Sequence, residues 1–485
     1  MHIKPIHLLA IILTLATIYF YQDPQSNGAS RLDATRAIVE RGNFQIDTFL
    51  KEPYWGAIDK AFYKGHYYTD KAIGTSLFAV LPYWILYKYA ALVGMELSST
   101  LIKHWLTTLI IGASFVINGI FLYKITQLIS PNSAKAFIAT LAISLGTMLW
   151  PFSEVYYGHV PAAMFLTIAF YCLFSLKETP DVISWGKFFG AGLALGFAYI
   201  TDYTTALIIA GLMVYAIYIL RKQSRLNFFR YGFFGFIGAL IPLSFMFAYN
   251  FSVYGNIFAI SYVNEASVVL QQGPDTRLIG YIALPNLSTL YHISFDPKFG
   301  LFWQSPVLIL AFVGYFLAIK TKLFQAETWL SIYSVASIFI MNAGLWTWWG
   351  GSTFGPRYLI VALPFFIIPL MLVPDSLMWL LGSLTVVSIA QMLIPLVSQI
   401  QIGLDFDITN GKFTINGPFT GFSILYNYGI HQIYKLYAKH TYPWTLGNVL
   451  GLRPRYSVLA LMALEAFLVG FSLRKLKMIS AQQAR

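Results

Sequence analysis

The chain has few charged residues and almost no cysteine. Only 11% of its 485 residues are Asp, Glu, Lys or Arg, whereas an average soluble protein has about 25%. This shortage excludes an ordinary soluble fold, and the mean hydropathy of +0.64 indicates a chain that folds in lipid. The single cysteine, Cys172, excludes an intramolecular disulfide, so packing alone must hold the loops together.

The sequence also lacks internal repeats, low-complexity tracts and long runs of like charge. Secondary transporters are often built from two inverted halves, so the missing repeat argues against that class. The formal net charge of +12 does not indicate nucleic-acid binding, because the basic residues are spread over short loops between apolar segments. That spacing is typical of the cytoplasmic loops of a membrane protein.

The apolar segments predict an all-α, polytopic membrane helix bundle of about twelve transmembrane helices, in a single domain over residues 1–485. The first segment, from about His7 to Tyr21, ends in aromatic residues and is interpreted as a retained signal anchor. The stretch from Ala72 to Gly94 is placed at the interface, because this choice keeps the basic loops inside. The other predicted spans are residues 104–128, 135–152, 159–176, 186–201, 203–220, 232–251, 300–319, 328–345, 358–373, 377–398 and 456–473.

This topology places four substantial pieces of the chain on the outer face, residues 22–103, 252–299, 346–357 and 399–455. In the first, residues 29–42 predict a helix that lies in the membrane interface, begins after Ser30 and ends at Gly42. The densest polar stretch follows at residues 59–71, Asp-Lys-Ala-Phe-Tyr-Lys-Gly-His-Tyr-Tyr-Thr-Asp-Lys. Ionisable groups next to a bilayer are costly, so this loop is the main candidate for a functional site.

Carboxylates and cations occur together in the first outer loop. A carboxylate can accept the proton of a hydroxyl group, and the candidates for this role are Asp59 first, then Asp33, then Asp70. Lys71 and His66 are candidates for substrate binding, because a cation can hold a phosphate group. Ion pairs within an interfacial helix would explain some of these charges equally well.

Later outer loops add further candidates. Glu154 and His159 lie in one tight turn and could bind a divalent metal ion, the one cofactor that the sequence suggests. A hydrogen-bonded structural role for His159 is the alternative. Other candidates for substrate binding are Asn264, Glu265, Trp349 and Arg357. Arg357 closes a Gly-rich string and could grip a phosphate with two hydrogen bonds, or extend to lipid headgroups instead.

Two strings carry a resemblance to a known family. One is the helix that ends Glu40-Arg41-Gly42 and leads to Gly65-His-Tyr-Tyr-Thr-Asp-Lys71, and the other runs from Trp348 to Tyr358. The chain resembles the GT-C superfamily of integral membrane glycosyltransferases, especially its protein-mannosyltransferase-like and aminoarabinose-transferase-like branch, glycosyltransferase family 39. The resemblance implies a polyprenyl-phosphate sugar donor, an extracytoplasmic site and an acid of the first outer loop as base. The position where the family places that acid falls near Asn27, which is not a base.

The expected function is therefore sugar transfer from a polyprenyl-phosphate donor to a hydroxyl of a glycan, lipid or protein acceptor. The expected location is the bacterial inner membrane, with the active site facing outside. A polymerase or ligase of lipid-linked glycans is an alternative and would depend on Arg and His in residues 399–455. A lipid or sugar transporter, such as a flippase, is a further alternative and would place charges near the midplane of the membrane.

Overall fold

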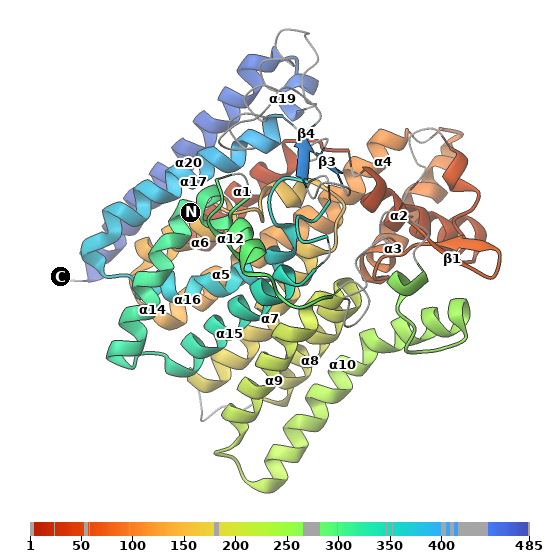
Figure 1. Ribbon diagram of the computed structural model, residues 1–485. Coiled ribbons are helices and arrows are strands. Elements are labelled where there is room, and N and C mark those ends of the chain that lie inside the picture. The colour runs from red at the N-terminus through yellow and green to blue at the C-terminus, as the bar shows by residue number, and fades with distance from the viewer. Residues whose placement is uncertain are drawn as a thin grey trace. The chain divides into compact units, whose positions relative to one another are not determined.

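The computed structural model describes residues 4–23, 25–52, 57, 59–96, 98–178, 184–264, 282–297, 299–345, 347–351, 353–398, 404–407, 412–415 and 445–483. Helices dominate this part of the chain (Figure 1), and its strands form two short antiparallel hairpins. The residues cluster into two compact units. Unit 1 comprises Met1–Gln22, Phe115–Phe152 and Pro285–Arg485, and unit 2 comprises Asp23–Ser114 and Ser153–Leu284.

Unit 2 contains most of the first outer loop and a group of packed helices. Its first hairpin pairs β1 (Ala61–Tyr63) with β2 (His66–Tyr68). Its helical elements are α2 (Gln25–Arg36), η1 (Ala37–Arg41), η2 (Phe49–Lys51), α3 (Gly74–Val93), α4 (Ser99–Leu106), η3 (Thr107–Gly112), α7 (His159–Glu178), α8 (Trp185–Thr201), η5 (Tyr203–Thr205), α9 (Ala206–Leu220), α10 (Arg225–Tyr254) and η6 (Ser261–Asn264).

Small residues let two helices of unit 2 approach closely. Helix α8 lies between α7 and α10 and contacts both (Figure 1). A Cβ atom at Gly192 of α8 would lie 1.8 Å from the backbone oxygen of Gly235 in α10. One at Gly238 of α10 would lie 2.2 Å from the backbone oxygen of Phe189. These backbones touch because glycine has no side chain, which is the usual way for helices to pack tightly in lipid.

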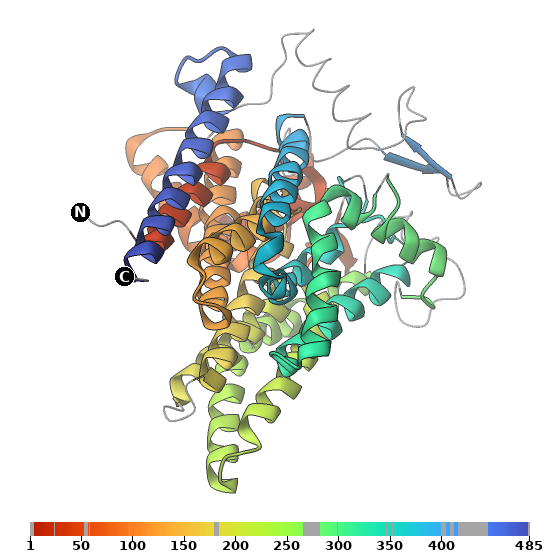
Figure 2. The same cartoon turned by 90° about the vertical axis from the view of Figure 1, so that its left-hand side faces the viewer.

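Unit 1 contains the two ends of the chain. Helix α1 lies along α20 (Figure 2) and contacts it. The helical elements of this unit are α1 (Pro5–Ile18), α5 (Ala113–Ile129, from Phe115 on), α6 (Ser133–Ser144), the first half of η4 (Pro151–Glu154), α12 (Leu287–Ser294), α13 (Leu301–Gln304), η7 (Pro306–Ile309), α14 (Leu310–Thr321), α15 (Gln325–Ala343), η8 (Arg357–Phe366), α16 (Ile367–Leu372), η9 (Asp375–Leu377), α17 (Met378–Val397), α19 (Leu446–Val449) and α20 (Pro454–Gln483). Its hairpin pairs β3 (Leu404–Asp407) with β4 (Lys412–Ile415).

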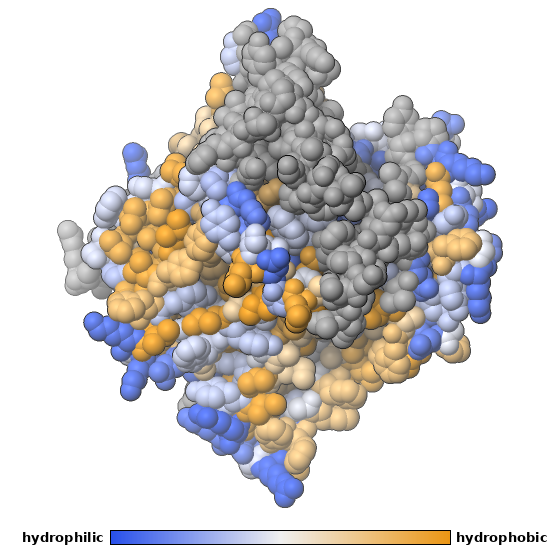
Figure 3. All heavy atoms as spheres, viewed as in Figure 1, coloured by the Kyte–Doolittle hydropathy of each residue, from blue (hydrophilic) through white to orange (hydrophobic). Residues whose placement is uncertain are grey.

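The helices confirm the predicted polytopic membrane bundle, and each predicted span falls wholly or partly on helical turns. Within the described residues, seven helices are long and apolar enough to cross a membrane, so the predicted count of twelve is not confirmed. Large apolar side chains are exposed along α10, and polar residues gather at the end of α10 that joins α9 (Figure 3). This distribution is that of an integral membrane protein.

The structure adds two details to the predicted first outer loop. The sequence predicted no strands, and the stretch after the interfacial helix forms the β1–β2 hairpin. The segment from Ala72 to Gly94 contains one uninterrupted helix, α3, that is long and apolar enough to span a bilayer. Its placement at the membrane interface stays a prediction.

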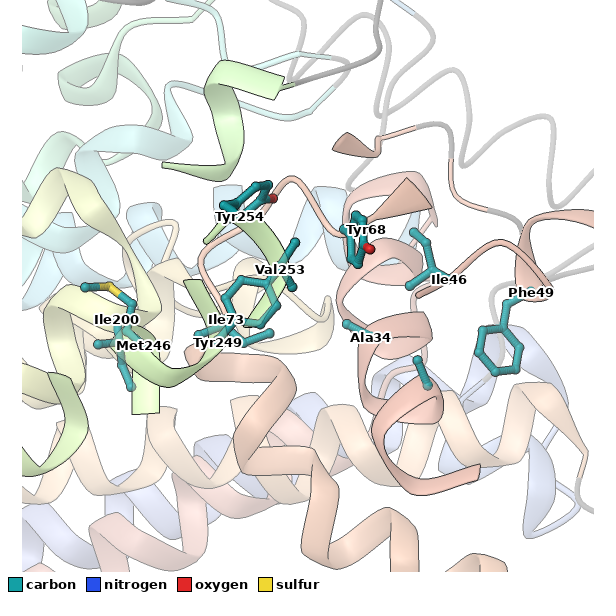
Figure 4. Packing of buried hydrophobic residues seen from close by; sticks show 11 residues of the cluster. Ala34, Ile46, Phe49, Tyr68, Ile73, Ile200, Met246, Tyr249, Val253 and Tyr254 are labelled. Carbon is teal, nitrogen blue, oxygen red and sulfur yellow. The ribbon is translucent and has the colours of Figure 1, made fainter. Parts of the chain in front are cut away.

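An apolar cluster holds the first outer loop onto the helices of unit 2 (Figure 4). Ile46 and Phe49 of the loop, together with Tyr68 at the end of β2, pack into this cluster. Helix α10 contributes Met246, Tyr249, Val253 and Tyr254, and α8 contributes Ile200. Buried aromatic side chains of this size contribute most of the packing energy in such a core. The loop is therefore a fixed part of the unit.

Candidate functional site

The β1–β2 hairpin determines which polar residues of the first loop meet. Its turn is Lys64-Gly65, with φ angles of +46° and +88°. Two successive residues with positive φ form the tight turn that suits a two-residue hairpin, and glycine adopts this conformation without strain. Ala61 is paired with Tyr68 at the open end of the hairpin. The residues just before β1 and just after β2, Asp59 and Thr69 to Lys71, are therefore brought together.

The centre of the candidate site is Lys71 between two carboxylates. Its Nζ atom lies 2.6 Å from Oδ2 of Asp70 and 3.1 Å from Oδ2 of Asp59. The side chain of Asp70 is fully buried, whereas that of Asp59 is 31% exposed. Burial raises the pKa of Asp70 above its usual range, although the charge of Lys71 opposes the rise. Asp59 is thus the carboxylate of this pair that a substrate can reach.

Hydrogen bonds with neighbouring hydroxyl groups hold Asp59 and Asp70 in place. The Oγ atom of Ser30, on α2, donates to Oδ1 of Asp70 at 3.3 Å. Ser261, on η6, donates to the backbone oxygen of Asp70 at 2.7 Å. The backbone N–H of Asp59 donates to Oγ of Ser26, also on α2, at 2.8 Å. Two segments of unit 2, α2 and η6, therefore hold the acids beside Lys71.

Arg31 is a second buried cation near this centre, besides Lys71, and it lies on α2. Only 4% of its surface is exposed. Its Nη1 atom donates to the backbone oxygen of Ala72 at 3.1 Å and to Oγ1 of Thr75 at 2.7 Å, and its Nε donates to Oδ1 of Asn27 at 3.2 Å. A Cβ atom at Gly158 would lie 3.4 Å from both Nη atoms, so the turn before α7 packs directly against the guanidinium group.

His159 follows this turn as the first residue of α7, and its ring contacts Asp202. Nδ1 of His159 lies 2.6 Å from Oδ2 of Asp202, and Oδ1 of Asp202 accepts hydrogen bonds from the backbone N–H and the hydroxyl of Thr204. Burial would raise the pKa of Asp202, but the charge of His159 and these hydrogen bonds outweigh it and lower that pKa. Within the described ranges, no three His, Cys, Asp or Glu side chains are grouped to hold a metal ion. The predicted metal site at Glu154 and His159 therefore has no third protein ligand there.

Asp33 and His66, two other candidates of unit 2, have surroundings different from those of Lys71. Asp33, on α2, is completely buried, and neither carboxylate oxygen has a hydrogen-bond partner among the described residues. Burial raises its pKa well above the usual range. His66 lies at the turn end of the hairpin, where its Nδ1 is 3.5 Å from Asp47. Asn264 ends η6, the element that also carries Ser261, and Glu265 lies outside the described residues.

Arg357 and Trp349 belong to unit 1 and form a compact loop there. Gly350, Gly351 and Gly355 all have positive φ angles, between +69° and +78°. A Cβ atom at Gly350 would lie 2.9 Å from Cγ of Arg357, so the arginine folds back over the glycine. Trp349 is 7% exposed, and its ring packs edge-on against Trp348. The string therefore needs its glycines to wrap around Arg357.

The sequence did not single out Arg31 or Tyr262, which the structure places at the centre. The Nζ atom of Lys71 lies 5.5 Å from the centre of the Tyr262 ring. Burial raises the pKa of Tyr262, while the charges of Lys71 and Arg31 oppose the rise. The only sequence signal for Arg31 was its four-residue spacing from Asn27, which puts both side chains on one face of a helix.

Comparisons with known proteins identify the fold. No family model matches the sequence, and no curated protein matches it. The crystal structure of ArnT from Cupriavidus metallidurans bound to undecaprenyl phosphate is similar, with a TM-score of 0.52 and 13% identity over 97% of this chain and 76% of that one. The apo structure of the same protein gives a TM-score of 0.53 and 13% identity over 97% and 75%. The chain therefore shares the fold of ArnT, which agrees with the fold predicted from the sequence.

Proposed function

We propose that the protein is a membrane glycosyltransferase of the GT-C type. It transfers a sugar from a polyprenyl-phosphate donor to a hydroxyl of a glycan, lipid or protein acceptor, at the outer face of a bacterial inner membrane. The observation that carries this proposal is the Asp59–Lys71–Asp70 cluster in the first outer loop. The fold supports it, since ArnT has the same fold and was solved with undecaprenyl phosphate bound.

In the proposed reaction Asp59 is the general base. The acceptor oxygen forms a bond to the anomeric carbon and loses its proton to the Asp59 carboxylate. The bond between that carbon and the phosphate oxygen breaks, and the phosphate keeps the electron pair. Asp59 suits this role because its side chain is 31% exposed, whereas Asp70 and Asp33 are fully buried. Attack on the side opposite the leaving group inverts the anomeric centre.

The remaining residues bind the substrates in this proposal. Lys71 lies next to the base, and Arg357 supplies a planar group that matches the geometry of a phosphate. Trp349, His66, Asn264 and Glu265 are assigned to the sugar and the acceptor. A divalent metal ion at Glu154 and His159 stays a prediction, and no step of the proposed reaction depends on it.

The test is a transfer assay with the purified full chain in proteoliposomes. The donors are a panel of polyprenyl-phosphate-linked hexoses and pentoses, and the assay measures the polyprenyl phosphate that is released. We expect Asp59→Asn to slow release by a factor on the order of 10²–10⁴, as when a general base is removed. Asp47→Asn is the matched control, since Asp47 belongs to the same loop but lies at the turn end of the hairpin beside His66.

Two results would contradict the proposal. Movement of the donor across the vesicle membrane without cleavage would indicate a transporter. Full transfer activity in Asp59→Asn would exclude Asp59 as the base, and the polymerase or ligase alternative would then gain support.

A further inference from the structure

Arg31 differs from the other buried cations of unit 2, because no carboxylate pairs with it in the described part of the chain. Its hydrogen-bond partners there are the side-chain oxygens of Asn27 and Thr75 and the backbone oxygen of Ala72, all of them uncharged. Asp70 is close enough to feel the charge of Arg31, but its carboxylate is bonded to Lys71 and Ser30.

Each comparable cation nearby has an acidic partner. Arg36, one turn further along α2, binds Glu40 at 2.8 Å and Glu52 at 2.7 Å. Lys71 is held by two carboxylates, so its positive charge is offset within the protein. Lys103 is 3.5 Å from Asp23. A buried charge without a partner is costly, and proteins ordinarily pair it or use it to bind an oppositely charged group.

Asn27 occupies the position from which a carboxylate could pair with Arg31. It lies one helical turn before Arg31 on α2, and its Oδ1 accepts from Nε at 3.2 Å. A carboxylate of the same shape at this position would form a charge-assisted bond with the guanidinium and neutralise it. The amide holds the arginine in place through Nε without cancelling its charge. Nη1 is used by Ala72 and Thr75, and Nη2 has no partner among the described residues.

We propose that Arg31 binds the phosphate group of the donor and that Asn27 preserves the charge needed for this. The inference rests on the proposed function for the identity of the anion. Among the cations of unit 2, it assigns the binding of the phosphate to Arg31 and not to Lys71, whose charge two carboxylates offset. The fixed guanidinium offers Nη2 to a phosphate oxygen. An arginine held by three other hydrogen bonds loses little side-chain entropy when it binds such a group.

The test measures binding of farnesyl phosphate, a short polyprenyl phosphate, to the purified full chain in detergent by calorimetry. Asn27→Asp keeps the shape and the Oδ1 acceptor but adds a carboxylate beside Arg31. We expect it to weaken binding roughly ten- to a hundredfold, as for the loss of one hydrogen bond to a charged group. Arg31→Lys should weaken binding to a similar degree, because lysine lacks the planar fork.

A matched control and a stability measurement separate binding from folding. Asn43→Asp adds the same charge in the same loop at an exposed turn, where the Oδ1 of Asn43 accepts from the backbone of Gln45. It should bind farnesyl phosphate like the wild type. Asn27→Asp should resist heat at least as well as the wild type, because the new carboxylate gains an ion pair. Weaker binding with undiminished thermal stability is the result expected from a neutralised Arg31.

Two further titrations identify the source of the phosphate. Inorganic phosphate and nanodiscs containing phosphatidylglycerol replace farnesyl phosphate in the same measurement. Tighter binding of farnesyl phosphate than of either, lost in Asn27→Asp, supports the donor as the ligand. Wild-type affinity for farnesyl phosphate in both Asn27→Asp and Arg31→Lys would overturn the inference, as would equal binding of all three probes. The proposed function fails separately, if the wild type binds the lipid but transfers no sugar.

Discussion

The two carboxylates that flank Lys71 should respond to the same chemical change in opposite ways. Asp59→Asn and Asp70→Asn each remove one negative charge within 3.1 Å of the same ammonium group and preserve the shape of the side chain. We expect the first to abolish transfer while the protein stays stable. We expect the second to destabilise the protein, because Asp70 is completely buried beneath Lys71.

The expected losses of stability in the two variants follow from the solvent exposure of the two carboxylates. Breaking a buried ion pair costs about 3–5 kcal/mol, since it leaves a charge buried and unpaired. For Asp70→Asn we expect the free energy of unfolding to fall by about 3 kcal/mol. This value is at the lower end of that range because Asp59 still offsets part of the Lys71 charge. Asp59 is 31% exposed, and solvent screens such a pair, so its removal should cost no more than about 1 kcal/mol.

Two assays on the same preparations decide between these roles. Denaturant-induced unfolding in mixed detergent micelles, followed by tryptophan fluorescence, gives the change in stability. Release of polyprenyl phosphate gives the turnover of the protein that remains folded. The reasoning is refuted if Asp59→Asn is as unstable as Asp70→Asn, since Asp59 would then be a structural partner of Lys71. It is also refuted if folded Asp70→Asn is inactive while Asp59→Asn turns over normally.

Three other predictions concern topology, a phosphate contact and helix packing. In a Cys172→Ala background, cysteine at Lys64 should react with an impermeant thiol reagent from outside, and labelling only after permeabilisation would reverse the orientation. Arg357→Lys should lower donor turnover about tenfold without unfolding, because the planar fork is lost, and wild-type turnover would make Arg357 a headgroup anchor. Gly238→Ala should destabilise by about 1–3 kcal/mol through overpacking, since its Cβ would lie 2.2 Å from a backbone oxygen of α8. Gly235→Ala, with 3.6 Å at the same interface, should be neutral or stabilising in the same unfolding measurement.

The sequence was a good guide to elements with local signals. Apolar runs predicted the helices, because a backbone in lipid must satisfy its hydrogen bonds within each segment. The dense polar stretch correctly placed Asp59 and Lys71 in one loop, and the structure brings them into contact. The hairpin that does so was missed, although Lys64-Gly65 is a residue pair compatible with a tight turn.

Contacts between distant segments were beyond the reach of sequence patterns. Proximity in the sequence drew attention to Glu154 beside His159, but gave no sign of the contact between His159 and Asp202, 43 residues further along the chain. Arg31 stands out because no described segment places a carboxylate within hydrogen-bonding distance of its guanidinium group. A single sequence shows which charges a chain has, and only the folded arrangement shows which of them stay uncompensated.

The contact between Asn27 and Arg31 depends on a side-chain amide that can be lost by a chemical reaction. Asn27 is followed by Gly28, and an asparagine before a glycine is prone to lose its amide when the backbone nitrogen of the glycine attacks the side chain. That attack needs an extended backbone, and both residues lie within the first turn of α2. The folded helix therefore protects the amide, whereas a chain that unfolds in storage acquires a carboxylate next to Arg31. The cyclic imide formed by this attack releases ammonia and is opened by water, mostly to isoaspartate and partly to aspartate, so refolding would not restore the amide beside Arg31.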